Sequence, residues 1–222
     1  MEYSYQTKKG KLFDIIVQSP EMEIKRKLLA LQASFRVFDG NYHELIQYLE
    51  YPHEKSENQE VLIDETSRLL HNFLASAGSL VEHTRVIVKK LYSDMHQFRK
   101  EYDLKKSEEL VKNNVQNFIK NLRNYTLHET LPILELQNSF SENLLLNIQI
   151  DVKMVKESEH WQSWEDSQYY LNKLGDSTKL IDLVKKYYEV IIVFYTWLTE
   201  RQHDDIHKAD LEKLQEMKKG IM

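Results

Sequence analysis

The sequence contains no cysteine and few residues that interrupt helices. The absence of cysteine among 222 residues excludes a disulfide framework, a thiolate zinc site and a cysteine nucleophile. It suits the reducing cytoplasm, where we expect the protein to act. The chain has only five glycines and three prolines, far below the roughly 12 per cent that these two residues reach together in an average protein. A chain with so few breakers favours long helices.

A long hydrophobic run is also missing. The most apolar window, Tyr187 to Leu198, is interrupted by Glu189, and a membrane-spanning helix needs roughly 20 apolar residues. The first ten residues are polar and show no signal-peptide pattern. We therefore expect neither secretion nor a membrane partner. The formal charge of −5 argues against a protein that is basic all over and coats nucleic acid, but a local basic groove remains compatible with it.

Helix signals begin near residue 19. Ser19 followed by Pro20 is typical of a helix start, because a hydroxyl caps the first turn and proline tolerates its first position. We expect this helix to run to about Phe38 and to break at Gly40 and Asn41, with a short helical piece after the break.

Three further segments repeat apolar residues at spacings of three and four. The first extends from about Val61 to Phe98, the second begins near Lys106 and includes Leu122, and the third extends from Leu180 to Leu198. We predict that the first two form antiparallel neighbours. Asp176 or Ser177 is the expected cap of the third, directly after Gly175 has ended a shorter helix.

Residues 133–155 have a different pattern. They are rich in Ile, Leu and Val with partial alternation, and polar residues divide the segment near its middle. This pattern predicts a β-hairpin.

The fold prediction is therefore mainly all-α: an antiparallel helical bundle with a small β-hairpin insertion. Residues 1–58 are expected to be a helical extension packed on the core, residues 59–200 the bundle domain, and residues 201–222 a charged helical tail that frays or projects.

Motifs for several enzyme classes are absent. The sequence has no Gly-rich phosphate loop, no G-x-S-x-G and no H-E-x-x-H, so nucleotide-hydrolysing, esterase and zinc-protease functions lack their signatures. His203 and His207 have a spacing that can hold a metal on one helix face, but the sequence identifies no third ligand. We therefore expect no metal and no cofactor.

The most informative stretch is Leu122 to Pro132. Arg123 is followed by Asn124 and, after four intervening residues, by His128, near the end of a long helix. This R-N-x-x-x-H pattern resembles the HEPN superfamily, whose signature is an arginine, commonly with a polar successor, and a histidine after four to six residues. The resemblance covers about residues 61 to 200, and its only specific element is this short motif.

The resemblance implies a metal-independent endoribonuclease that acts in toxin–antitoxin, defence or RNA-processing systems. In such an enzyme His128 would be the acid/base group, Arg123 the phosphate clamp and Asn124 an orienting hydrogen-bond partner. These residue types suit attack of a ribose 2′-hydroxyl on phosphate, which needs a group with a pKa near 7 and a fixed cation. Lys112 and Lys120 would attract RNA. The resemblance also implies a homodimer, and an antitoxin or another protein is a further expected partner.

Helix geometry constrains this interpretation. Residues five apart on an ideal helix differ by about 140° in direction, so Arg123 and His128 converge only under one of three conditions. The helix loosens or ends early, for which Thr126 and Pro132 are candidates; it bulges locally; or a second subunit completes the site.

A structural interpretation stays open beside the catalytic one. Arg123 could lay its stem on the core and pair with an acid such as Glu129 or Glu135, while His128 caps the end of its helix. The protein would then be a noncatalytic helical module for dimerisation or protein interaction.

Overall fold

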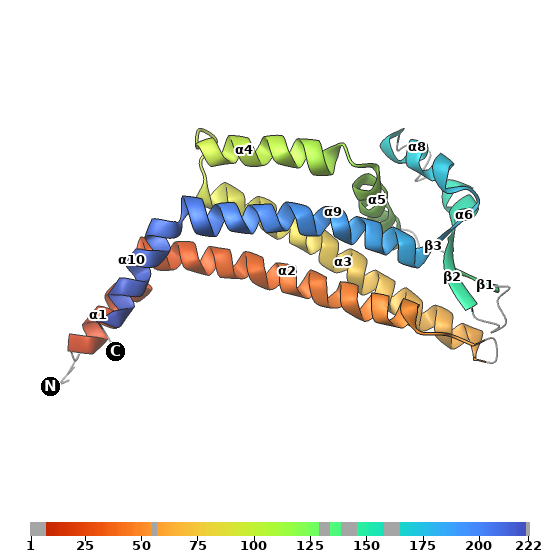
Figure 1. Ribbon diagram of the computed structural model, residues 1–222, viewed down its shortest axis with the longest axis horizontal. Helices are drawn as coiled ribbons and strands as arrows, with labels where there is room; N and C mark the ends of the chain where they lie inside the picture. Colours follow the sequence, from red (N-terminus) through yellow and green to blue (C-terminus); the bar gives the residue numbers. More distant parts are fainter. Residues whose placement is uncertain (1–7, 55–56, 129–133, 139–145, 158–164, 221–222) are drawn as a thin grey trace.

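The computed structural model describes residues 8–54, 57–128, 134–138, 146–157 and 165–220, and most of these residues are helical. Helix α2 packs against α3 and α9 along the length of the molecule, and a small antiparallel sheet lies at one end (Figure 1). This confirms a mainly helical fold with a small β insertion.

The elements follow in this order: α1 (Lys8–Val17), α2 (Pro20–Glu50), α3 (Gln59–Leu91), α4 (Gln97–Lys106), the π-helical turn η1 (Ser107–Val111), α5 (Asn114–His128), β1 (Leu134–Asn138), β2 (Leu146–Asp151), α6 (Val152–Glu157), α8 (Glu165–Leu174), β3 (Ser177–Lys179), α9 (Leu180–Glu200), the π-helical turn η2 (Arg201–Ile206) and α10 (Lys208–Lys219).

Helix α2 begins as predicted but does not break. The Ser19 hydroxyl accepts a hydrogen bond from the Met22 N–H at 3.2 Å, with Pro20 in the first position. The expected break at Gly40 is wrong, because α2 continues to Glu50. Phe38 and Leu45, on either side of that glycine, are fully buried. Their burial outweighs the intrinsic cost of about 1 kcal/mol for a glycine inside a helix.

Helix α3 is shorter than predicted. It ends at Leu91 instead of continuing to Phe98. Tyr92 is buried just beyond its end, and the ring of His96 accepts a hydrogen bond from the Phe98 N–H at 3.1 Å, which caps α4 as a separate helix.

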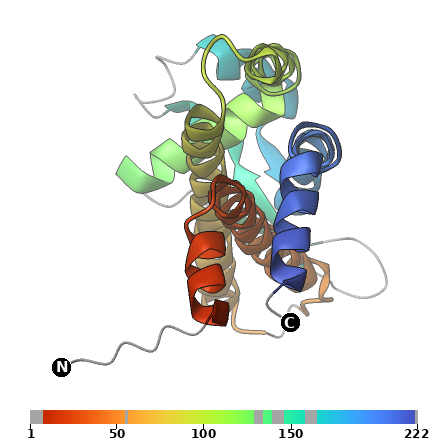
Figure 2. The same ribbon diagram turned by 90° about the vertical axis from the view of Figure 1, so that its left-hand side faces the viewer.

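Helix α5 begins later than predicted, and it is not antiparallel to α3. The chain near Lys106 belongs to the end of α4, and α5 starts only at Asn114. The Asn113 side chain accepts hydrogen bonds from the N–H groups of Val115 and Gln116 at 3.0 and 3.1 Å. Figure 2 shows that α5 runs across α3, so the predicted antiparallel pairing of these two helices is wrong.

The predicted hairpin is present. Strands β1 and β2 pair antiparallel, with Leu134 opposite Ile150 and Asn138 opposite Leu146. The segment is not extended throughout, because residues from Val152 onward form α6. Ser177 does not cap α9 as predicted; it begins β3, a third strand that pairs with β2.

An aromatic cluster joins the three long helices. The ring of Phe38 in α2 lies 5.6 Å from that of Phe73 in α3, and both contact Tyr187 in α9, at 6.1 and 5.8 Å. Aromatic pairs at such distances stabilise beyond their burial. Within the described residues no helix is long and apolar enough to cross a membrane.

The C-terminal segment bends away from α9 and packs on the N-terminal helices. In η2 the Gln202 amide donates to the Tyr92 hydroxyl at 3.2 Å, and the His207 ring lies 3.0 Å from the same hydroxyl. Helix α10 packs against α1 and α2 at the end of the molecule opposite the sheet (Figure 1). The tail predicted from residue 201 onward is helical through Lys219, but it does not fray, because it contacts α1 and α2.

The continuity of α2 yields a stability prediction. A Cβ atom at Gly40 would meet no atom within 4 Å, so Gly40→Ala should raise the free energy of unfolding by about 0.5–1 kcal/mol, measured by urea denaturation. A loss of stability would indicate that the helix breaks at Gly40 after all.

Candidate functional site

The predicted motif lies on a regular stretch of α5. The Thr126 hydroxyl donates to the carbonyl of Arg123 at 2.8 Å, and helical backbone continues to His128. Thr126 therefore does not loosen the helix before His128. Positions five apart on such a helix point about 140° apart, so α5 does not bring Arg123 and His128 to one face. The side chain of His128 lies outside the described residues, as does Pro132.

A cavity of about 160 Å³ lies where α5 crosses α3, with α9 behind it. Arg123 and Asn124 line it, together with Lys120, one of the two lysines predicted to attract RNA. Lys112 is exposed before the start of α5 and does not line this cavity. We call this cavity the α3–α5 pocket. Its other lining residues are Leu74, Ala77, Gly78, Val81, Glu82, Gln116, Ile119 and Tyr187.

Small residues of α3 form the crossing point. Ala77 and Gly78 present little side-chain volume to α5, which lets the two helices approach closely. The Arg123 side chain lies directly over Gly78: a Cβ atom added there would be 2.5 Å from Cζ and 2.6 Å from Cδ of Arg123. The arginine thus occupies space that any other residue at position 78 would fill.

The guanidinium of Arg123 is incompletely paired. Its Nε atom is buried and has no hydrogen-bond partner, and the same is true of Oε1 of Gln116, two turns earlier on the same face of α5. None of the ion pairs between described residues includes Arg123. A buried donor without a partner costs about 1–3 kcal/mol, and such an exception in a folded protein requires an explanation.

This finding bears on the structural interpretation of Arg123. Of the two acids considered as its partners, Glu129 lies outside the described residues. Glu135 in β1 is described, but no ion pair between the two residues is found. Glu82 lines the pocket, but its carboxylate pairs with Arg85 at 2.9 Å.

Tyr187 forms the wall of the pocket on the α9 side. Burial raises the pKa of its phenol well above the usual value, and the nearby positive charge of Arg123 lowers it by less. The phenol therefore keeps its proton near neutral pH. The pocket consequently combines two cations, two amides and a neutral hydroxyl, and its one carboxylate, that of Glu82, is paired with Arg85. This composition is suited to an anion.

The histidines considered as metal ligands are held by other groups. Nδ1 of His207 lies 2.9 Å from a carboxylate oxygen of Asp210, and its Nε2 lies next to Tyr92. Nε2 of His203 lies 3.0 Å from the amide nitrogen of Gln32. A search of the described residues finds no group of three or more potential metal ligands.

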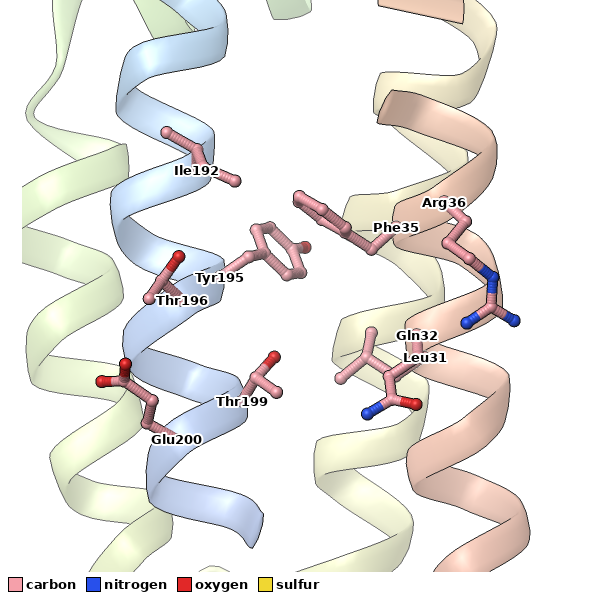
Figure 3. Close-up of a pocket in the computed structure, with 9 residues that line it drawn as sticks. All are labelled: Leu31, Gln32, Phe35, Arg36, Ile192, Tyr195, Thr196, Thr199 and Glu200. Atoms are coloured by element: carbon pink, nitrogen blue, oxygen red, sulfur yellow. The ribbon is translucent and has the colours of Figure 1, made fainter. Parts of the chain in front are cut away.

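A second, larger cavity of about 330 Å³ lies between α2 and α9 and contains none of the predicted site residues. Figure 3 shows Phe35 and Tyr195 facing one another across it, with ring centroids 5.7 Å apart. Arg36 and Glu200 lie at its rim. Its floor is apolar, and its lining offers less polar chemistry than the α3–α5 pocket.

Sequence reasoning missed Gly78 and Tyr187 as pocket residues. The two residues lie on other helices, and only the crossing of α5 over α3 shows that they line the pocket. Gln116 lies seven residues before Arg123 and hence on the same helix face.

Comparisons with protein-family models, with curated proteins and with solved structures each found no match. The HEPN resemblance therefore stands on the motif alone.

Because Nε of Arg123 is unpaired, we can predict how removing the charge changes the stability of the protein. Arg123→Met keeps a side chain of similar length but deletes the buried donor, so the free energy of unfolding should stay within about 0.5 kcal/mol of wild type or rise. Urea denaturation measures it. A loss of about 1.5–3 kcal/mol would instead show that the arginine makes a stabilising charged hydrogen bond.

Proposed function

We propose that this protein is a metal-independent endoribonuclease of the HEPN type, and that the α3–α5 pocket binds a phosphate of its RNA substrate. The observation that carries the proposal is the buried and unpaired Nε of Arg123, in a pocket shared with Lys120 and Asn124. Folding has placed a cation where it gains no ion pair from the described residues, and an anionic ligand would supply the missing partner.

The chemistry follows from the residue types. His128 accepts the proton of a ribose 2′-hydroxyl as that oxygen attacks the adjacent phosphorus, and Arg123 stabilises the charge that develops on the phosphorane. The bond from phosphorus to the 5′-oxygen then breaks, and that oxygen takes up a proton. The products are a 2′,3′-cyclic phosphate and a free 5′-hydroxyl. Asn124 orients the phosphate, and Lys120 attracts the neighbouring backbone.

The regular course of α5 determines how the site is assembled. Because α5 stays helical from Arg123 to His128, the two positions face different directions in one chain. We propose that His128 from a second copy of the chain completes each pocket across a two-fold axis. A two-fold dimer contains two such sites, each made of Arg123 from one copy and His128 from the other.

A noncatalytic dimerisation or protein-interaction module is the second candidate. The same regular helix favours it, since a single chain has no converged Arg–His pair. In that case Arg123 would bind an acidic group of a partner protein, such as an antitoxin.

Cleavage of RNA in the presence of EDTA distinguishes the two candidates. Wild-type protein should cleave a mixed pool of single-stranded RNA and leave cyclic phosphate ends. His128→Ala and Arg123→Ala should each lower the rate at least 100-fold while the circular dichroism spectrum stays unchanged. Absence of cleavage by folded, dimeric wild-type protein would favour the interaction module.

Mixing the two inactive variants tests the shared site. After exchange of subunits, half of the dimers contain one copy of each variant, and each such dimer carries one intact site of its two. The mixture should therefore regain about a quarter of the wild-type rate. If both residues act within a single chain, mixing restores no activity.

A further inference from the structure

Gly78 occupies an unexpected position. It lies in the interior of α3, between the buried residues Ala77 and Leu80, where glycine is disfavoured relative to alanine. Its backbone does not require a glycine, because among the described residues only Gly175 has a positive φ. The reason for glycine at this position must therefore lie in its surroundings.

The three atoms nearest to a Cβ at position 78 all belong to one side chain. A Cβ atom at position 78 would collide with Nε, Cδ and Cζ of Arg123, with distances of 2.5 Å to Cζ and 2.6 Å to Cδ. Nε and Cζ belong to the guanidinium group, and Cδ is bonded to it. A methyl group at position 78 would therefore move the whole guanidinium out of its place over α3.

Gly40, the other glycine inside a long helix, has different surroundings. Gly40 in α2 has nothing within 4 Å of its missing Cβ. Glycine lowers the stability of the helix to a similar extent at both positions, but only Gly78 leaves space that a neighbouring side chain occupies.

We propose that Gly78 is a positioning residue for Arg123. Because it lacks a Cβ, it leaves the space in which the guanidinium lies across α3 and reaches the α3–α5 pocket. Tyr187, which also lines this pocket, is held in place by its contacts with Phe38 and Phe73. This inference rests on the proposed function, since it assigns Gly78 a part in binding the scissile phosphate.

The Gly78→Ala variant tests the proposal, with Gly40→Ala as its matched control. Displacement of a catalytic group by about 1 Å can cost 100-fold in rate. Gly78→Ala should therefore lower kcat for RNA cleavage by about 100-fold with little change in the urea midpoint, whereas Gly40→Ala should keep the wild-type kcat and unfold at a higher urea concentration. A Gly78→Ala protein that cleaves like wild type would overturn the inference and leave the ribonuclease proposal intact.

A double-mutant cycle separates this inference from the proposed function. In an Arg123→Ala background the atoms that collide with a Cβ at position 78 are gone, so Gly78→Ala should raise the urea midpoint about as much as Gly40→Ala does. In the wild-type background Gly78→Ala should change the urea midpoint little. This coupling is measurable whether or not the protein cleaves RNA. Equal midpoint shifts in the two backgrounds would show that position 78 does not act through Arg123, and would reject the proposal.

Discussion

The contact of Phe38, Phe73 and Tyr187 is the interaction on which the arrangement of the molecule depends. It joins the consecutive helices α2 and α3 to α9, which comes from a distant part of the chain, around one set of buried rings. Because Tyr187 also forms a wall of the α3–α5 pocket, the core and the candidate site share a residue. The pocket is therefore built on rigid helices and not on loops, which is what a site for a precisely held phosphate requires.

The crossing of α5 over α3 adds the second constraint. Gly78 lets Arg123 lie flat across α3, and the same contact buries Nε away from water without a partner. Two locally unfavourable features thus coincide: a glycine inside a helix and an unpaired buried donor. Natural proteins violate such local rules mainly at functional sites, and the proposed phosphate ligand accounts for both features together.

Much of the fold could be predicted from the sequence, because apolar spacing and caps are local signals. The helix after Ser19, the hairpin and the apolar helix ending near Leu198 were found in this way. The errors arose where tertiary contacts outweigh local preference. Burial of Phe38 and Leu45 carries α2 through Gly40, and the burial of Tyr92 separates α3 from α4. The place of Arg123 and Asn124 on α5 could be predicted. The contact of Arg123 with Gly78 and the position of Tyr187 in the pocket could not, because no sequence pattern reports how two helices cross.

Binding of an RNA that cannot be cleaved tests the central claim, that Arg123 is held in the α3–α5 pocket to bind a phosphate. A fluorescent single-stranded oligonucleotide with 2′-methoxy groups would be titrated with wild-type protein and with Arg123→Met at several salt concentrations. We expect Arg123→Met to bind about tenfold more weakly and the slope of log affinity against log salt to fall by about one, as for loss of one phosphate contact. Equal affinity and equal salt dependence of the two proteins would contradict the account.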